Sequence, residues 1–215
     1  MGPITKTKAI PAKQARAQRT MERVEAAARA ALNQESWADL TMAALARAAK
    51  TSVGSIYARF PSKEALLDRL DEIYCEEIIA LNTALSDDPK LTSFDDAMST
   101  FVRDLARYHR AHAGLIRTLI LETRTAGHPA FHERSDRMNK ALKGVARRLG
   151  ALAEAEGRTF PADKISWVLF LVLSTMRELA LFSQGLPRPK VGFAKGEAEI
   201  IEMAQGYLAR MEGKS

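Results

Sequence analysis

Apolar residues recur with a helical period along almost the whole of this 215-residue chain, and this spacing limits how it can fold. From residue 16 to residue 34, for example, Val24, Ala27, Ala28, Ala31 and Leu32 follow the pattern i, i+3, i+4, i+7 and i+8, which is one face of a helix. Similar runs cover residues 42–49, 53–59, 63–85, 92–111, 113–125, 129–157, 162–185 and 195–211. No run shows the alternation typical of a strand. The sequence therefore predicts an all-α fold of about nine helices.

Positive charge is concentrated in the first third of the chain. Residues 1–63 contain eleven Lys and Arg against four Asp and Glu, whereas residues 64–215 contain twenty-one against twenty-two. The first part therefore carries +7 and the second −1, which together give the net charge of +6. This asymmetry is expected when one part of a chain meets a polyanion such as nucleic acid, although a membrane surface would attract it too.

Two short helices joined by a tight turn are predicted between Thr41 and Phe60. The hydroxyl groups of Thr41 and Ser52 can cap the first turns of the two helices, and Pro61 ends the second. The larger apolar side chains can form a small core, which leaves small and hydroxylated residues of the second helix on the surface. Such a helix is suited to a DNA major groove.

In order and spacing, this segment resembles the N-terminal signature of the TetR/AcrR family of bacterial transcription regulators. The matching residues are Thr41, Met42, Leu45, Ala46, Ala49, Ser52, Gly54, Ser55, Ile56, Tyr57, Phe60, Ser62, Lys63, Glu64 and Leu66, and Trp37 stands where the family usually has an aromatic residue. The resemblance covers about residues 19–70. Lys50 and Thr51 depart from it, because the family usually has glycine and valine there. If residue 50 has a left-handed backbone, lysine costs roughly 1 to 2 kcal/mol at that position.

The resemblance implies that the helix at residues 53–59 enters the major groove. Gly54 would let the backbone approach the duplex closely, Val53 could meet a thymine methyl group, and Tyr57 could reach a phosphate. The predicted DNA-binding residues are Thr41, Thr51, Ser52, Val53, Gly54, Ser55, Tyr57, Arg59 and Lys63.

The resemblance also implies three parts of the chain. A basic flexible arm (1–15) is followed by a helix-turn-helix domain (16–62) and a helical domain (63–215) that binds an effector and forms a homodimer. The helix at 63–85 links the last two. The predicted ligand-binding residues are Phe101, Tyr108, His112, Leu115, Phe131, Trp167, Phe170 and Arg177. One hypothesis is that Arg177 and His112 orient the polar end of an apolar ligand; the alternative is that they are structural.

Dimerisation is expected because one short recognition helix reads only a few base pairs, whereas a two-fold pair reads a palindrome. We expect the last two helices to carry the dimer interface. Its predicted residues are Trp167, Leu171, Ser174, Glu178, Leu181 and Phe182.

The predicted function is a transcription regulator, most simply a repressor that binds a palindromic DNA operator as a homodimer and is released by a small-molecule effector of unknown identity. The alternatives are an activator, a DNA-binding protein without an effector, and a metal sensor that uses His109 with His112 or His128 with His132. The motifs of nucleotide-binding, hydrolase and zinc-protease sites are missing, so we expect no enzyme activity, no cofactor and no bound metal. We expect a cytoplasmic protein, because no secretory signal is visible and the most apolar run, Trp167 to Leu173, is too short to cross a membrane.

Overall fold

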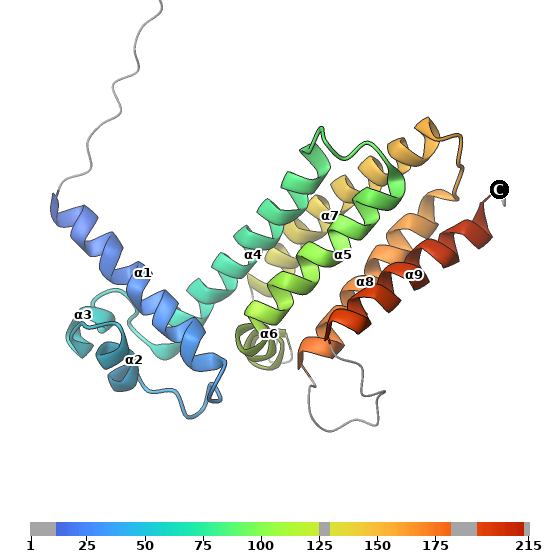
Figure 1. Ribbon diagram of the computed structural model, residues 1–215. Coiled ribbons are helices and arrows are strands. Elements are labelled where there is room, and N and C mark those ends of the chain that lie inside the picture. The colour runs from blue at the N-terminus through green and yellow to red at the C-terminus, as the bar shows by residue number, and fades with distance from the viewer. Residues whose placement is uncertain (1–11, 125–129, 182–192, 213–215) are drawn as a thin grey trace, which may run out of the picture. The chain divides into compact units, whose positions relative to one another are not determined.

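The computed structural model describes residues 12–124, 130–181 and 193–212, and every regular element in these ranges is helical (Figure 1). The all-α prediction is therefore confirmed. The helices are α1 (Ala12–Leu32), α2 (Met42–Ala48), α3 (Val53–Tyr57), α4 (Lys63–Asp87), α5 (Phe94–Ala111), α6 (Ala113–Leu119), α7 (Ala130–Ala155), α8 (Ala162–Leu181) and α9 (Phe193–Met211), with a π-helical segment η1 (Ile120–Arg124) after α6. The contacts divide the chain into two compact units, one that ends at Leu70 and one that begins at Asp71. Helix α4 contributes to both units.

The first unit is built from α1, α2, α3 and the first two turns of α4. Helix α1 packs on α2, and α2 packs on α3. The core consists of fully buried aliphatic side chains from each element, among them Leu32, Leu45, Ile56 and Leu66. Burying each of these side chains stabilises the fold by roughly 1.5 to 3 kcal/mol, and this burial holds together helices that are too short to be stable alone.

The turn between α2 and α3 contains a left-handed lysine. Lys50 has a φ of 51°, so residue 50 does have the left-handed backbone at which a lysine is strained. The amide of Lys50 donates to the carbonyl oxygen of Arg47 at 3.1 Å, and the amide of Thr51 donates to that of Ala46 at 2.9 Å. These are the two hydrogen bonds of a Schellman motif, which normally has glycine at the left-handed position.

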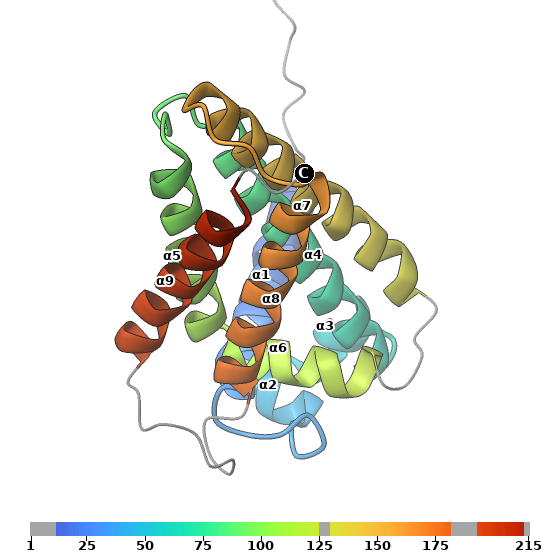
Figure 2. The same cartoon turned by 90° about the vertical axis from the view of Figure 1, so that its right-hand side faces the viewer.

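The second unit is a bundle in which α5 and α8 are the central helices. Helix α5 packs on α7, α8 and α9, and α8 also packs on α6, α7 and α9. Helix α6 runs across one end of the bundle (Figure 2). The buried residues of α5 include Phe94, Met98, Phe101 and Leu105, which are all less than 2% exposed. The sequence predicts one helix over 113–125, and the structure divides this segment into α6 and η1. The apolar pattern does not reveal the division, because a π-helical turn changes the register of the hydrogen bonds without changing that pattern.

A search for membrane-spanning segments among the described residues finds no helix with the length and apolar character to cross a bilayer.

Replacing Lys50 with glycine should raise the free energy of unfolding by about 1 kcal/mol, because glycine adopts a positive φ without steric strain. Urea denaturation measures the change. Lys50→Ala is the matched control: it removes the ammonium group but keeps the strain, so it should leave stability near that of the wild type. Equal stabilities of the glycine and alanine variants would contradict this explanation.

The imidazole of His109 in α5 should make folding sensitive to acid. The side chain is fully buried, its Nδ1 lies 2.9 Å from the carbonyl oxygen of Leu105, and its Nε2 has no hydrogen-bond partner among the described residues. Burial lowers the pKa of His109 to about 4, although the Leu105 carbonyl acts in the opposite direction. Between pH 6.5 and about 4 the unfolded chain therefore binds a proton that the folded chain does not.

We predict that the free energy of unfolding falls as the pH decreases through this range, with a contribution from His109 that approaches about 1.4 kcal/mol per pH unit. Urea denaturation at several pH values gives the slope. His109→Leu should lose this contribution while other titrating groups keep theirs. If the two proteins lose stability in parallel below pH 6.5, His109 is not the cause.

Candidate nucleic-acid interface and ligand cavity

Side-chain caps fix the ends of α2 and α3. The amide of Ala44 donates to Oγ1 of Thr41 at 3.1 Å, and the amide of Ser55 donates to Oγ of Ser52 at 3.1 Å. The hydroxyl groups of Ser52 and Ser55 also lie 2.8 Å apart. The hydroxyl of Ser52 therefore holds the start of α3, a helix of only five residues, in one conformation.

One side of α3 is buried and the other is exposed. Ile56 is fully buried, whereas Val53 and Tyr57, one turn apart, are 36% and 47% exposed. Between them, a Cβ atom added to Gly54 would have no atom within 4 Å. Ser55 is also exposed. Val53, Gly54, Ser55 and Tyr57 thus form a surface that no other described element of this unit covers, and we call it the α3 face.

The other predicted DNA-binding residues surround this helix in the sequence. Arg59 and Thr41 are exposed, and Thr51 is partly exposed. Lys63, at the start of α4, donates from its ammonium group to the carbonyl oxygens of Trp37 and Ala38, and it lies 4.6 Å from the centre of the Trp37 ring. Sequence reasoning assigned Trp37 only a matching position. In the structure Trp37 holds the Lys63 side chain. The contact of Lys63 with DNA stays a prediction.

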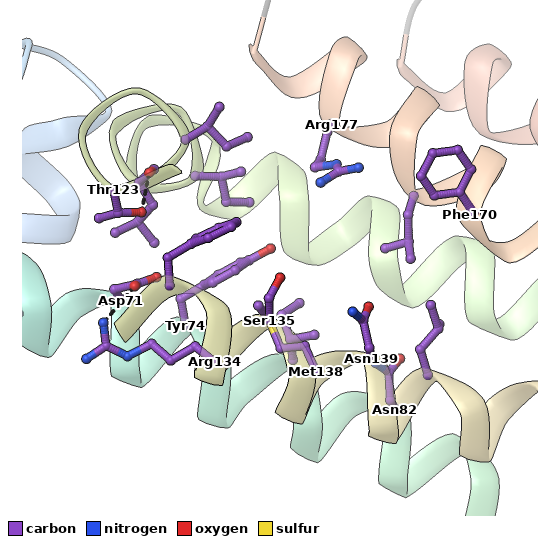
Figure 3. Close-up of a pocket in the computed structure, with 17 residues that line it drawn as sticks. Asp71, Tyr74, Asn82, Thr123, Arg134, Ser135, Met138, Asn139, Phe170 and Arg177 are labelled. Carbon is purple, nitrogen blue, oxygen red and sulfur yellow. Dashed lines mark hydrogen bonds and ion pairs between the residues drawn. The ribbon is translucent and has the colours of Figure 1, made fainter. Parts of the chain in front are cut away.

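The second unit contains a cavity of about 340 Å³ (Figure 3). Its walls come from α4, α6, η1, α7 and α8. Most of the lining side chains are apolar, which is typical of small-molecule sites, and the volume lies at the lower end of their usual range. Helix α4 contributes Asp71, Tyr74, Ile78 and Asn82.

A buried ion pair forms one part of the wall. Nη1 of Arg134 in α7 lies 2.8 Å from Oδ2 of Asp71, and its Nε lies 3.0 Å from Oε2 of Glu72. The guanidinium of Arg137 lies 2.7 Å from Glu72. The hydrogen bond from Arg137 contributes most to lowering the pKa of the Glu72 carboxyl, and Arg134 adds to it. This network joins α4 to α7.

Tyr74 and Arg177 point into the cavity from opposite walls (Figure 3). Burial raises the pKa of Tyr74 to about 12, so its hydroxyl keeps its proton at neutral pH. The Tyr74 ring packs against Tyr108 with 6.1 Å between the ring centres. In α8, Nη2 of Arg177 donates to the hydroxyl of Ser174 at 3.3 Å.

The predicted ligand-binding residues divide into three groups. Phe131, Phe170 and Arg177 line the cavity. Phe101 and Leu115 are completely buried, so they belong to the core. Tyr108, His112 and Trp167 lie outside the cavity and are described next. Spacing on a helix could not separate these groups, because it does not show which helices enclose an empty space.

Tyr108 and His112 line a separate open hollow next to α5, with 4.6 Å between the centres of their rings. The hydroxyl of Tyr108 donates to Glu77 at 2.7 Å. His112 thus lines this hollow and not the cavity that Arg177 lines, so their joint action on one ligand stays a hypothesis. His112 is the cap residue between α5 and α6, whereas Arg177 lies on α8.

All the predicted dimer-interface residues except Phe182 lie on α8. Trp167 is half exposed, Leu171 and Ser174 are partly buried, and Glu178 is exposed. The Leu181 side chain and the whole of Phe182 lie outside the described residues. Trp167 stacks on Phe170 with 5.4 Å between the ring centres, and both rings are about half exposed. Met203 on α9 is 47% exposed.

Among the described residues, no group of three or more His, Cys, Asp or Glu side chains is arranged to hold a metal ion. His109 is buried and His132 is exposed, whereas His128 lies outside the described ranges.

Comparison with known proteins gives a family match for part of the chain and a fold for most of it. Residues 26–70 match the sequence family described as bacterial regulatory proteins, tetR family. A regulatory protein of the tetR family from Rhodococcus is 19% identical, with a TM-score of 0.67 over 88% of this chain and 96% of its own. A TetR transcription regulator from Haloarcula marismortui is 18% identical, with a TM-score of 0.65 over 91% and 99%. The fatty acid degradation regulator FadR from Bacillus halodurans is 15% identical, with a TM-score of 0.61 over 88% and 96%. No curated protein matches the chain.

The Arg134–Asp71 pair supports a prediction about stability. Arg134→Leu should lower the free energy of unfolding by about 3 to 5 kcal/mol, because it leaves a buried carboxylate without its partner. Replacing Asp71 with leucine in the same protein should restore most of the loss, since a packed apolar pair can substitute for a buried ion pair. Urea denaturation of the single and double variants tests both statements.

Arg137→Leu is the control. Its side chain is 39% exposed, so the loss should stay below about 1 kcal/mol. If the double variant is no more stable than Arg134→Leu alone, the two side chains stabilise the fold by more than neutralising each other's charge.

Proposed function

We propose that this chain, whose residues 26–70 belong to the tetR family and whose fold is that of the family's solved members, regulates transcription by binding DNA. The observation that carries the proposal is the α3 face. It presents an apolar group, a glycine, a hydroxyl and a phenol on a capped helix, within the part of the chain that carries the positive charge. This is the chemistry of a helix that reads a major groove. The role is regulatory rather than enzymatic.

On this proposal, Val53 and Ser55 contact base edges, and Gly54 brings the backbone close to the duplex. Tyr57, Thr41 and Thr51 contact phosphates, together with Ser52 and the cations Arg59 and Lys63. Contacts with phosphates fix the position of the protein, whereas contacts with bases give specificity. Binding through these cations should weaken as the salt concentration rises.

We also propose that the regulator is a homodimer joined through α8 and α9. Trp167, Phe170 and Met203 support this, because they place large exposed apolar groups on these two helices. Two copies related by a two-fold axis would present two α3 helices to half-sites about one helical turn of DNA apart. The operator is then a palindrome.

We also propose that a small-molecule effector binds in the cavity and that the protein acts in the cytoplasm. Helix α4 is one uninterrupted helix from Lys63 to Asp87, so its beginning belongs to the DNA-binding unit and its later turns line the cavity. A ligand that changes the preferred position of α4 would change operator affinity. A coupling of about 1 to 3 kcal/mol, or 5- to 150-fold in affinity, is usual for such a link. We propose repression that the effector releases.

Selection of bound sequences from a random pool of duplex DNA tests this function. We expect a palindromic site whose half-sites lie about one turn of DNA apart. Gly54→Ala should bind the selected site at least about tenfold more weakly, since a methyl group would separate backbone and duplex, while protein stability should be unchanged or higher by roughly 0.5 to 1 kcal/mol.

Gly150→Ala in α7 is the matched control, because its added Cβ would lie 3.8 Å from Ile165, an ordinary contact. It should bind DNA like the wild type. Selection that yields no preferred sequence, or equal binding by the Gly54 variant and the wild type at the same salt concentration, would contradict the proposal.

A further inference from the structure

The walls of the cavity in the second unit are largely apolar, so its ligand needs an apolar body. Each α-helix that lines it contributes such side chains: Ile78 from α4, Leu119 from α6, Phe131 and Met138 from α7, and Phe170 from α8. At roughly 30 Å³ for each water-sized group, a volume of about 340 Å³ holds about eleven non-hydrogen atoms. The cavity therefore suits a small molecule whose surface is mostly hydrocarbon.

Two ionised side chains of the wall already bind each other. Nη1 of Arg134 lies 2.8 Å from Oδ2 of Asp71, and the two side chains are 8% and 7% exposed. Nε of Arg134 also lies 3.0 Å from Oε2 of Glu72. An anion that bound Arg134 would have to displace one of these carboxylates, and a cation that bound Asp71 would have to displace Arg134. Because breaking a buried ion pair is costly, neither charge is available to a ligand.

Arg177 is the third ionised side chain among the described residues of the wall, and it is also engaged by the protein. Its Nη2 donates to the hydroxyl of Ser174 at 3.3 Å, and the residue has a further interaction in the chain. Among the described residues, no buried polar side-chain atom of the cavity wall lacks a hydrogen-bond partner. The wall therefore contains no described group that needs a charged ligand for its own stability.

The other polar side chains of the described wall are uncharged. Burial raises the pKa of Tyr74 to about 12, so its hydroxyl keeps its proton at neutral pH. Asn82, Ser135 and Asn139 contribute two amides and a hydroxyl (Figure 3). Amides and hydroxyls can form hydrogen bonds with a hydroxyl or a carbonyl group of a ligand, and no charge is needed on either side.

Hydration decides between a charged and an uncharged ligand. An ion that enters this cavity loses its water shell, and apolar walls replace none of the lost hydrogen bonds. The charged groups that could replace them are bound within the protein. An uncharged ligand loses much less hydration and gains the same apolar contacts.

We propose that the cavity binds an uncharged, mostly apolar molecule of about eleven non-hydrogen atoms, with at most one small polar group such as a hydroxyl. The proposal names the chemical class of the effector, so its regulatory meaning rests on the proposed function. The binding itself does not depend on DNA.

Titration calorimetry of the full chain with 1-decanol, decanoate and decylammonium tests this proposal. The three probes have nearly the same apolar chain and differ in the charge of the head group. Decanol should bind at least about tenfold more tightly than either ion, because only the ions must bring a charge out of water. If either ion binds as tightly as decanol, or if no probe binds, the proposal is wrong.

Variants that fill the cavity show whether decanol binds there. Met138→Trp places an indole in the space and should weaken decanol binding at least about tenfold, and Ser135→Phe fills the same space from one turn earlier in α7. Arg147→Trp is the matched control: it adds an indole at an exposed position of α7 outside the cavity, so it should bind decanol like the wild type. Urea denaturation identifies the variants that fold. A folded cavity-filling variant with wild-type affinity for decanol would overturn the proposal.

DNA binding separates this proposal from the proposed function. On the selected duplex, decanol should release the wild type, whereas Met138→Trp should bind DNA normally and not be released. If the chain binds no specific duplex, the regulatory function fails while the calorimetric preference can still stand. If decanol binds but does not release DNA, the effector role fails and the ligand class stands. If the chain binds DNA but does not prefer decanol, only the ligand class fails.

Discussion

A buried guanidinium must be surrounded by groups that balance its charge, and in this protein Arg134 imposes that requirement. Its contacts with Asp71 and Glu72 hold α7 against α4 immediately after the point where α4 passes from the first unit to the second. The cavity is lined by the same two helices together with α6, η1 and α8. The ion pair thus fixes one wall of the cavity, and apolar side chains of α4, α5, α7, α8 and α9 form the core of the unit.

The first unit meets a different constraint, because a five-residue helix cannot be stable by itself. The hydroxyl of Ser52 caps the N-terminus of α3, and the buried side chain of Ile56 packs α3 on the core. The left-handed turn at Lys50 directs the chain from α2 into α3. Rigidity of the exposed face therefore comes from its surroundings, and the residues of the face remain available for contacts with another molecule.

The helices could be predicted from the sequence because the apolar pattern that forms a helix and the capping residues that end it are both local. The fourth helix, predicted over 63–85, is observed as Lys63–Asp87, and the predicted caps Thr41 and Ser52 are observed as caps. The cavity could be predicted only in part. Periodicity identifies the buried side of a helix but not its neighbour, so Phe101 in the core and Phe131 in the cavity wall had the same signal. Arg134 and Asp71 are 63 residues apart, and only the folded chain brings them together.

The stacked rings of Trp167 and Phe170 have a practical consequence. Phe170 belongs to the cavity wall, while Trp167 covers it from the exposed side of α8. The chain has only one other indole, Trp37, which lies in the first unit beside Lys63. The two chromophores therefore belong to different units. The emission of Trp167 is an intrinsic optical signal of changes in the cavity, whose wall includes the Phe170 ring.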